Sequence, residues 1–276
     1  RWNGWGEATT VVELPAQGAG FLAARLGAGR VLPDATLEEA LARVPASRLA
    51  AHGLYSVEPH DRLLHARGQS LPDWLALREG APGLYPDAVA FPDSAGQVRQ
   101  LLALAQAQDL CLIPYGGGTS VAGHINPPDS VRPVVTVSLA RMNRLLDLDE
   151  QSMLATFGQG ASGPQVESQL RARGYTLGHF PQSWELSTLG GWVASRSSGQ
   201  QSLRYGRIEQ LFAGGTLETF AGPLEIATFP ASAAGPDLRE VVLGCEGRFG
   251  IISQVKVRVS ALPADERFYG VFLPDW

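Results

Sequence analysis

The sequence is poor in the residues that mark several protein classes. Its two cysteines, Cys111 and Cys245, lie in apolar surroundings, which argues against a disulfide framework and for a reducing compartment such as the cytoplasm. It holds one lysine, Lys256, and its formal net charge is -5, whereas nucleic-acid-binding domains are typically basic. No apolar run reaches the ~18 residues that a membrane-spanning helix needs. We therefore expect a cytoplasmic protein with no membrane span and no nucleic-acid partner.

Several motifs of catalysis and metal binding are also absent. The sequence has no G-x-x-x-x-G-K-[ST] loop of P-loop NTPases, no G-x-S-x-G elbow of hydrolases, and neither C-x-x-C nor H-E-x-x-H for a metal ion. We expect no metal. The five histidines are scattered along the chain. We single out His179, because it stands next to a polar loop at residues 181–188.

What remains is the composition of a globular protein. The 276 residues, 45% hydrophobic and 18% charged, suit one large domain or two subdomains. Residues 1–85 are expected to be helical and irregular, with a capping box from Thr36 to Glu39 and a helix at residues 71–78.

From residue 88 the pattern predicts a strand, a helix and a second strand. A short strand at residues 88–91 is followed by Ser94, a favoured N-cap residue. The helix over residues 95–108 has an apolar stripe at spacings of three and four. The strand at residues 111–113 is expected to end at Pro114.

The remaining chain is expected to be mostly strands. Proline is favoured at a helix start and glycine just past a helix end, which places one helix between Pro164 and Gly174. The expected elements are a strand at 134–137, paired strands at 145–150 and 153–157, a helix at 164–173, a hairpin of 216–220 with 224–229, a short helix from 236, and a strand at 250–259.

Three consecutive glycines, Gly116 to Gly118, follow the second strand directly. Glycine lets successive backbone N–H groups turn toward one point and form an anion-binding nest. Thr119 and Ser120 add hydroxyl donors, so the loop can hold a dinucleotide diphosphate without a lysine. A plain tight turn is the structural alternative.

A rival glycine motif lies at residues 158–163, GQGASG. It fits the G-x-G-x-x-G fingerprint of the Rossmann fold, follows a strand and precedes a helix. However, another strand precedes that strand, and the acidic residue expected ~20 positions later is missing. We favour the interpretation that these glycines permit close packing in a strand-to-helix turn.

Further motifs occur in order along nearly the whole chain. They are RWNGWG at 1–6, DRLLHARG at 61–68, LREG at 77–80, PYGGGTSV at 114–121, GHFPQS at 178–183, STLGGWVASRSSG at 187–199, YGRIE at 205–209, GPDL at 235–238 and GCEGRFGII at 244–252. With these motifs the chain resembles the alkyldihydroxyacetonephosphate synthase branch of the FAD-dependent vanillyl-alcohol oxidase family, which has the PCMH-type fold.

The resemblance implies an α+β fold in three parts. A mainly helical N-terminal segment (1–85) would precede a PCMH-type FAD-binding domain (86–263), made of two α/β subdomains at about 86–140 and 141–263. Residues 264–276 would begin a substrate or cap domain. The chain does not begin with Met, and we expect it to be a piece of a longer protein. In this family the cap supplies the catalytic residues, so none is assigned here.

The resemblance also implies where the chain would hold FAD. Residues 114–120 would wrap the diphosphate, 182–188 would run near the flavin, 195–198 would add polar contacts, and 246–252 would line the adenosine and ribityl side. The predicted contacts are Pro114, Tyr115, Gly116, Gly117, Gly118, Thr119, Ser120, Gln182, Ser183, Trp184, Glu185, Leu186, Ser187, Thr188, Ser195, Arg196, Ser197, Ser198, Glu246, Gly247, Arg248, Phe249, Gly250, Ile251 and Ile252.

The chain departs from the family at some of these positions. Cys245 stands where a serine is usual, Arg248 and Phe249 replace a small polar and a Leu-like residue, and Gln182 replaces an acid. No histidine or cysteine is placed for a covalent flavin bond, so we expect non-covalent FAD.

Three functions stay open at this point. The resemblance implies an alkylglycerone-phosphate synthase-like transferase of ether lipid synthesis, which exchanges the acyl group of acyl-dihydroxyacetone phosphate for a fatty alcohol through a transient flavin adduct. The same FAD domain could serve an oxidase or dehydrogenase of a 2-hydroxy acid such as lactate or glycolate, or a non-catalytic FAD-binding module. We expect a small-molecule or lipid-like substrate, and a homodimer stays open.

Overall fold

The computed structural model describes residues 1–6, 9–10, 12–27, 29 and 33–275, in which a mainly helical segment precedes two larger sheets and a small two-stranded one. The helices are α1 (Ala16–Leu26), α2 (Leu37–Ala42), α3 (Pro59–Leu64), α4 (Leu71–Arg78), α5 (Ala95–Gln108), α6 (Gly163–Arg171), α7 (Leu189–Ser195), α8 (Ser202–Tyr205), α9 (Ile208–Leu211) and α10 (Leu238–Val242). The strands are β1 (Ala88–Ala90), β2 (Cys111–Tyr115), β3 (Val134–Ser138), β4 (Leu145–Asp149), β5 (Leu154–Gly158), β6 (Tyr175–Thr176), β7 (Phe212–Thr219), β8 (Gly222–Ile226), β9 (Ile251–Arg258) and β10 (Ser260–Ala261).

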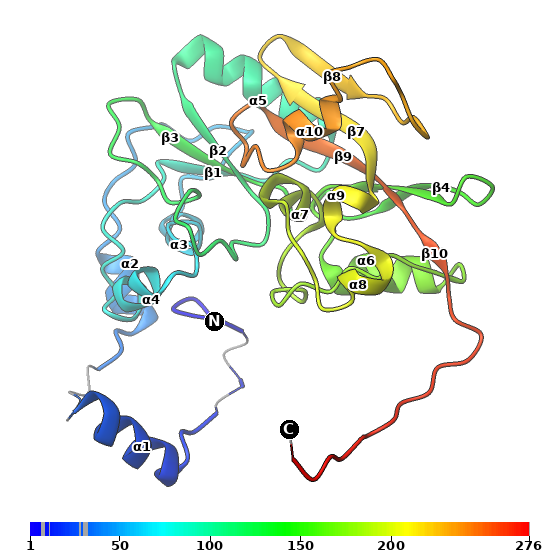
Figure 1. Cartoon of the computed structure of the whole chain (residues 1–276). Helices are drawn as coiled ribbons and strands as arrows, with labels where there is room; N and C mark the ends of the chain where they lie inside the picture. The colour runs from blue at the N-terminus through cyan, green and yellow to red at the C-terminus, as the bar shows by residue number, and fades with distance from the viewer. Residues whose placement is uncertain (7–8, 11, 28, 30–32, 276) are drawn as a thin grey trace.

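The first sheet is parallel, in the order β1-β3-β2, and helix α5 covers it. Ser94 caps α5 by accepting a hydrogen bond from the backbone N–H of Gln97 at 3.4 Å. The helix also contacts β7 and β9 of the second sheet, so it joins the two sheets, as Figure 1 shows. Its buried face is the predicted stripe, Val98, Leu101, Leu102 and Ala105.

The second sheet is antiparallel, in the order β4-β5-β9-β7-β8. Helices α6, α7 and α9 contribute side chains to the same apolar core as its strands. Phe157, Trp192 and Phe212 are the largest side chains of this core. Together the sheets and helices confirm the mixed α and β fold class. The subdomain boundary near residue 140 stays a prediction.

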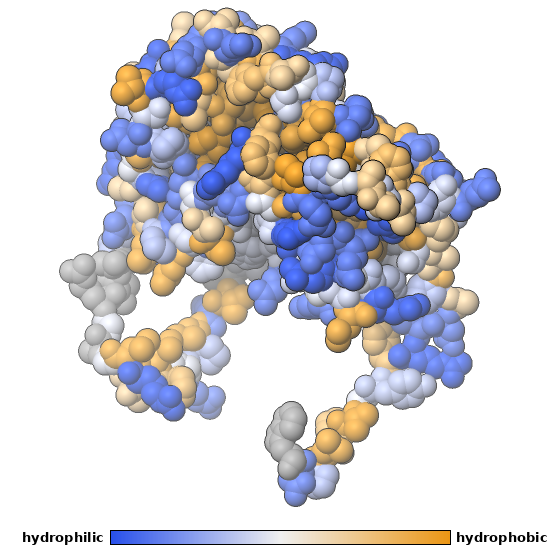
Figure 2. All heavy atoms as spheres, turned by 45° about the horizontal axis from the view of Figure 1, so that its top comes forward, coloured by the Kyte–Doolittle hydropathy of each residue, from blue (hydrophilic) through white to orange (hydrophobic). Residues whose placement is uncertain are grey.

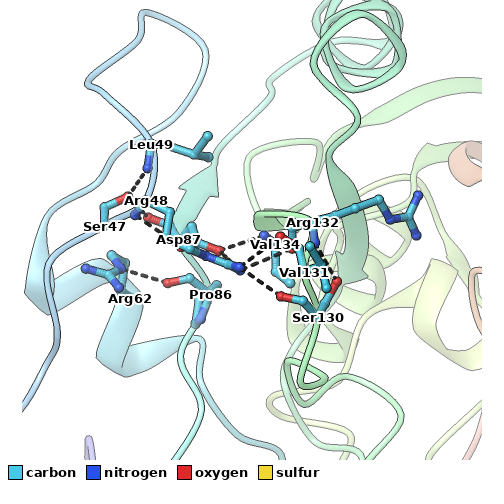
Figure 3. A network of polar contacts seen from close by, with 10 residues as sticks. All are labelled: Ser47, Arg48, Leu49, Arg62, Pro86, Asp87, Ser130, Val131, Arg132 and Val134. Atoms are coloured by element: carbon cyan, nitrogen blue, oxygen red, sulfur yellow. Dashed lines mark hydrogen bonds and ion pairs between the residues drawn. The ribbon is translucent and has the colours of Figure 1, made fainter.

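A polar network ties the N-terminal segment to the first sheet (Figure 3). Arg48 makes a two-pronged contact with the carboxylate of Asp87, at 2.8 and 2.7 Å, just before β1. The same guanidinium donates to the backbone carbonyls of Ser130 and Arg132, ahead of β3. The Asp87 carboxylate also accepts the backbone N–H of Val134 at 2.7 Å. One buried carboxylate therefore fixes the segment before β1 against the start of β3.

Helix α1 and the segment after β10 extend away from the two sheets in Figure 1. No side chain of α1 is buried. Both segments carry exposed apolar residues, including Phe21 on α1 and Phe268 and Phe272 after β10. Figure 2 shows orange, hydrophobic atoms on both segments at its bottom. The last residue of the predicted cap segment, position 276, lies outside the described residues. No helix in the described part of the chain is long and apolar enough to cross a bilayer.

Several element boundaries differ from the sequence prediction. Strand β2 does not end at Pro114 but continues to Tyr115. A proline is tolerated there because β2 is an edge strand, which leaves one side of its backbone unpaired. Helix α6 begins at Gly163, one residue before the predicted start, and ends at Arg171, two residues before the predicted end.

The predicted hairpin is present but longer on its first strand. Strand β7 begins at Phe212, four residues before the predicted start, and β8 begins at Gly222. The start of β7 was not predicted because it contains Gly214 and Gly215, and glycine is not a typical strand residue. A Cβ on either glycine would collide with a backbone carbonyl, that of Ile226 or Gln254, so the strands can approach only because these residues lack side chains.

Candidate functional site

The glycine loop after β2 is packed tightly on its inner side. A Cβ on Gly116 would collide with the Thr188 side chain, and one on Gly117 with the backbone carbonyl of Leu186. Gly118 has a φ of 69°, in the left-handed region. A Cβ there would meet the ring of Tyr115. Each glycine is therefore required for close approach, for backbone conformation, or for both.

The amides of this loop have no hydrogen-bond partner in the part of the chain that the structure describes. Within the described part of the chain, no acceptor is recorded for the backbone N–H groups of residues 116–120. Gly118 is buried, residues 116, 119 and 120 are half-buried, and Gly117 is exposed. Since buried backbone donors are almost always paired, the unpaired amide of Gly118 is the most unusual of the five. A row of unpaired N–H groups in a glycine turn is a nest that suits an anion.

A cavity of about 270 Å³ lies against this loop and brings the predicted segments together. Its walls come from the loop after β2, from the segment before α7, from the end of α7 and from the turn before β9. The predicted residues that line it are Gly116, Gly117, Gly118, Thr119, Ser120, Ser183, Ser187, Thr188, Ser195, Ser197 and Glu246.

Neighbouring cavities extend the groove in both directions. One, of about 80 Å³, joins Pro114, Tyr115 and Gly116 to Glu246, Gly247, Gly250 and Ile252. A second, of about 350 Å³, adds Arg248, Phe249 and Ile251. A third, of about 780 Å³, shares Thr119 and Ser183 with the central cavity and adds Gln182 and Ser198. Because these cavities share wall residues, they lie next to one another, and an elongated dinucleotide suits such a row of adjacent spaces.

Four predicted residues line none of these cavities. Trp184 packs where a Cβ on Gly163 would fall, and Leu186 contributes its backbone carbonyl to the packing of the glycine loop. Glu185 is exposed. Arg196 forms an ion pair with Glu240. Trp184, Leu186 and Arg196 thus hold neighbouring segments in place.

Hydroxyl groups on the wall differ in their freedom to donate. Ser187 donates to the carbonyl of Ser183 at 2.8 Å and accepts from the Trp192 indole at 2.6 Å. Ser195 donates to the carbonyl of Gly191 at 2.9 Å. Both hydroxyl hydrogens are therefore already engaged, and these two serines organise the wall.

Ser197 is held from behind by a buried histidine. The Nε2 atom of His179 lies 2.7 Å from the Ser197 hydroxyl oxygen, and its Nδ1 atom has no partner among the described residues. Burial lowers the pKa of His179 to about 4, so the ring is neutral near pH 7. An unpaired acceptor nitrogen is better tolerated than an unpaired N–H, which favours the tautomer with the proton on Nε2. Ser197 then accepts from the ring, and its own hydrogen is free for the cavity.

The tyrosine beneath the loop is also uncharged. Burial raises the pKa of Tyr115 to about 12, because its ring is enclosed below the glycines. Its hydroxyl lies 3.4 Å from the carbonyl of Leu64. Tyr115 therefore supports the loop as a neutral, packed side chain.

The rival glycine motif offers no free backbone donor. The N–H groups of Gly158 and Gly160 bond to the carbonyls of Arg144 and Met142, at 2.9 and 2.8 Å. The other amides of residues 158–163 are also bonded within the protein. A Cβ on Gly160 would collide with the backbone at Leu139. The interpretation as a close-packing turn is confirmed, and strand β5 pairs only antiparallel, unlike a Rossmann strand.

The structure adds wall residues that sequence reasoning missed. Gln159 is buried and lines the 80 Å³ cavity, and its Nε2 atom lacks a partner among the described residues. His124 lines the three cavities around Glu246. His124 could have been predicted, because it follows the glycine loop by only a few residues. No sequence feature pointed to Gln159, because it lies inside the glycine motif that was interpreted as a packing turn.

The residues present therefore fit FAD on the observations of this chain alone. Five unpaired amides suit a diphosphate, and the buried Gln159, whose Nε2 atom has no partner among the described residues, lines a neighbouring cavity of the same groove. No cluster of three or more potential metal ligands occurs in the described ranges.

Comparison with known proteins agrees with this geometry. Residues 86–222 match the family described as FAD binding domain. The alkyldihydroxyacetonephosphate synthase of Dictyostelium discoideum is 38% identical over 213 residues, which is 77% of this chain and 35% of the relative. A solved structure of an alkyldihydroxyacetonephosphate synthase has a TM-score of 0.84 and 29% identity, and covers 96% of this chain and 55% of its own. A mitochondrial cytochrome D-lactate dehydrogenase of Arabidopsis thaliana is 28% identical over 180 residues, 64% of this chain and 31% of the relative.

These findings define a flavoprotein with a PCMH-type FAD-binding domain. The chain belongs to the FAD-dependent vanillyl-alcohol oxidase family and within it is similar to the alkyldihydroxyacetonephosphate synthases. It spans about a third of the length of the Dictyostelium relative and just over half of the solved structure.

Proposed function

We propose that this chain is the FAD-holding part of an alkylglycerone-phosphate synthase-like enzyme. Such an enzyme exchanges the acyl group of acyl-dihydroxyacetone phosphate for a fatty alcohol. The reaction is supported by the similarity to alkyldihydroxyacetonephosphate synthases over most of the chain. The cofactor role rests on one observation above all, the five unpaired amides of residues 116–120 on the wall of a multi-loop cavity.

In this proposal the chain binds and orients FAD, and the flavin supplies the group that activates the substrate. The amides of residues 116–120 hold the diphosphate, helped by the hydroxyls of Thr119 and Ser120. The hydroxyl of Ser197, held by His179, donates to the cofactor from the opposite wall. FAD is bound non-covalently. The groups that handle the substrate lie in the part of the enzyme that a cap domain provides.

A second reaction deserves a direct comparison, because the D-lactate dehydrogenase shares this region. The domain would then serve oxidation of a 2-hydroxy acid. One experiment separates the two reactions in the full-length protein, with its FAD spectrum recorded first. Incorporation of labelled hexadecanol into an ether lipid, without bleaching by D-lactate under anaerobic conditions, supports the transferase. Bleaching by D-lactate or glycolate without incorporation overturns the transferase in favour of the dehydrogenase. If neither activity is observed, the remaining function is an FAD-binding module.

A further inference from the structure

Gln159 is a buried side chain with an unused hydrogen-bond donor. The residue is 3% exposed, and its Nε2 atom has no partner among the described residues. An amide donor buried without a partner costs free energy, because its hydrogen bonds to water are lost and not replaced. Gln159 lines the groove that the FAD site occupies. A costly donor at this place is explained if a ligand supplies the acceptor.

The surroundings of Gln159 hold its side chain in place. Its backbone N–H bonds to the carbonyl of Ser253 in β9 at 3.3 Å, and its carbonyl accepts the N–H of Gly190 in α7 at 2.8 Å. The carboxamide lies against Gly190, where a Cβ would collide with both the side-chain oxygen and the Cβ of Gln159. The absence of a side chain at Gly190 therefore makes the room that the carboxamide occupies beside the groove.

The cavity at Gln159 lies next to the unpaired amides of the glycine loop. It has a volume of about 80 Å³ and shares Gly116, Gly191 and Glu246 with the central cavity of about 270 Å³. Its small volume suits the slender middle of a dinucleotide better than either of the two ring systems. Glycine and apolar residues form most of its wall, and the hydroxyl of Ser195 on that wall already donates to a backbone carbonyl.

The chemistry of this small space calls for an acceptor. The backbone N–H of Gly116 on the same wall is also unpaired within the described ranges. Water needs two to four polar partners, which a wall of mostly glycine and apolar residues supplies poorly. Phosphate oxygens are acceptors only, and their charge strengthens the hydrogen bonds that they receive. The diphosphate is therefore the part of FAD that best satisfies both donors.

We propose that Gln159 binds the cofactor directly, with its Nε2–H group donating to an oxygen of the FAD diphosphate. This inference rests on the proposed FAD site and adds a side-chain donor to its backbone amides. Gln159 directly follows β5 of the antiparallel sheet, whereas residues 116–120 follow β2 of the parallel sheet, so both sheets hold the diphosphate. The same donor destabilises the protein without FAD and stabilises its complex with FAD.

The test compares Gln159→Met with wild type in the full-length protein, freed of FAD and then titrated with it. Methionine is about as long as glutamine and has no N–H group. We expect the dissociation constant of FAD, measured by flavin fluorescence, to rise about tenfold or more, the effect of losing one hydrogen bond to a charged group. The thermal transition of the FAD-free variant should stay the same or rise, because the unpaired donor is gone.

The matched control is Gln169→Met, which makes the same substitution at a half-buried glutamine. The Gln169 carboxamide is paired, because it donates to the carbonyls of Asn143 and Gln165 and accepts the N–H of Leu145. It lines a separate cavity that shares no wall residue with those of the groove. Gln169→Met should therefore lower the thermal transition and keep the wild-type affinity for FAD.

Two fragments of the cofactor identify the group that Gln159 contacts. ADP carries the diphosphate without the flavin, and riboflavin carries the flavin without phosphate. Gln159→Met should weaken FAD and ADP by a similar factor and leave riboflavin unaffected. Unchanged FAD affinity, a loss that extends to riboflavin, or a thermal transition lowered as in Gln169→Met overturns the inference while leaving the FAD site in place. Wild-type protein that binds no FAD overturns the proposed function itself.

Discussion

Gly117 is the residue at which the site tolerates least change. A Cβ there would collide with the backbone at Leu186, and an aspartate would also place a carboxylate beside the diphosphate. We predict that Gly117→Asp loses stoichiometric FAD, measured as flavin absorbance per protein after desalting. Gly96→Asp is the matched control, because a Cβ at Gly96 in the first turn of α5 would meet only the Ser94 hydroxyl, at an ordinary contact distance of 3.9 Å. Full flavin content in Gly117→Asp would remove the glycine loop from the site.

His179 gives the stability of the protein a pH dependence at the residue scale. Its pKa is lowered by burial to about 4 in the folded state, against about 6.5 when unfolded. The folded state therefore binds its proton less readily. Stability is complete above pH 6.5 and falls as the pH drops toward 4, by about 3 kcal/mol for this group.

Urea unfolding between pH 7 and 4 measures this loss. We expect His179→Gln to have a smaller pH dependence, since glutamine keeps a donor for Ser197 but cannot take up a proton. Part of the dependence should remain, because burial also lowers the pKa of His65. An unchanged pH dependence in the variant would contradict the assignment.

At the residue scale the sequence identified backbone chemistry better than side-chain geometry. Gly116 to Gly118 were predicted as an anion-binding loop because three glycines and two hydroxyl residues directly follow a strand, although a plain tight turn was the alternative. Gln159 and His124 were not, since their roles depend on how segments far apart in the chain meet. The engaged hydroxyl of Ser187 was equally invisible, because its partner Trp192 is fixed only by the fold of α7.

At the scale of elements, helices with local signals were predicted well. Ser94 indicated the start of α5, and the apolar stripe indicated its buried face, because capping and periodicity are properties of neighbouring residues. Strand β7 was cut short, because Gly214 and Gly215 are turn-forming by type and are strand residues only through their cross-strand neighbours. The strand end predicted at Pro114 was wrong for the same reason, since only the order of the strands in the sheet makes β2 an edge strand.

The network that joins the N-terminal segment to the first sheet should matter more than a surface ion pair. Burial alone would raise the pKa of Asp87, but hydrogen bonds from Arg48 and from the Val134 backbone lower it overall. Arg48→Ala leaves this buried carboxylate with fewer donors, and we predict a loss of roughly 1–3 kcal/mol in urea unfolding. Arg78→Ala breaks the exposed pair with Asp34 and should cost less than about 1 kcal/mol. Equal effects of the two variants would contradict the role of the network.

At the scale of the whole molecule, the site exists only where the two sheets meet. The loop after β2 belongs to the parallel sheet, and the segments around α7 and before β9 belong to the antiparallel one. FAD should therefore stabilise the fold as a unit, by about 2.7 kcal/mol at a free concentration of a hundred times its dissociation constant. The family resemblance, which rests on ordered motifs, predicted that these segments form one FAD site. Periodicity alone predicted the helices and strands but not which of them lie next to each other.

Hydrogen–deuterium exchange with and without FAD tests the central claim most directly, because it reports on the backbone N–H groups themselves. The five amides of residues 116–120 have no partner in the described chain, and those of 158–163 are already bonded. The account predicts that FAD slows exchange in the peptide covering 114–120 and leaves the peptide covering 158–163 unchanged. Protection confined to 158–163, or no protection at 114–120 in protein that holds FAD, would contradict it.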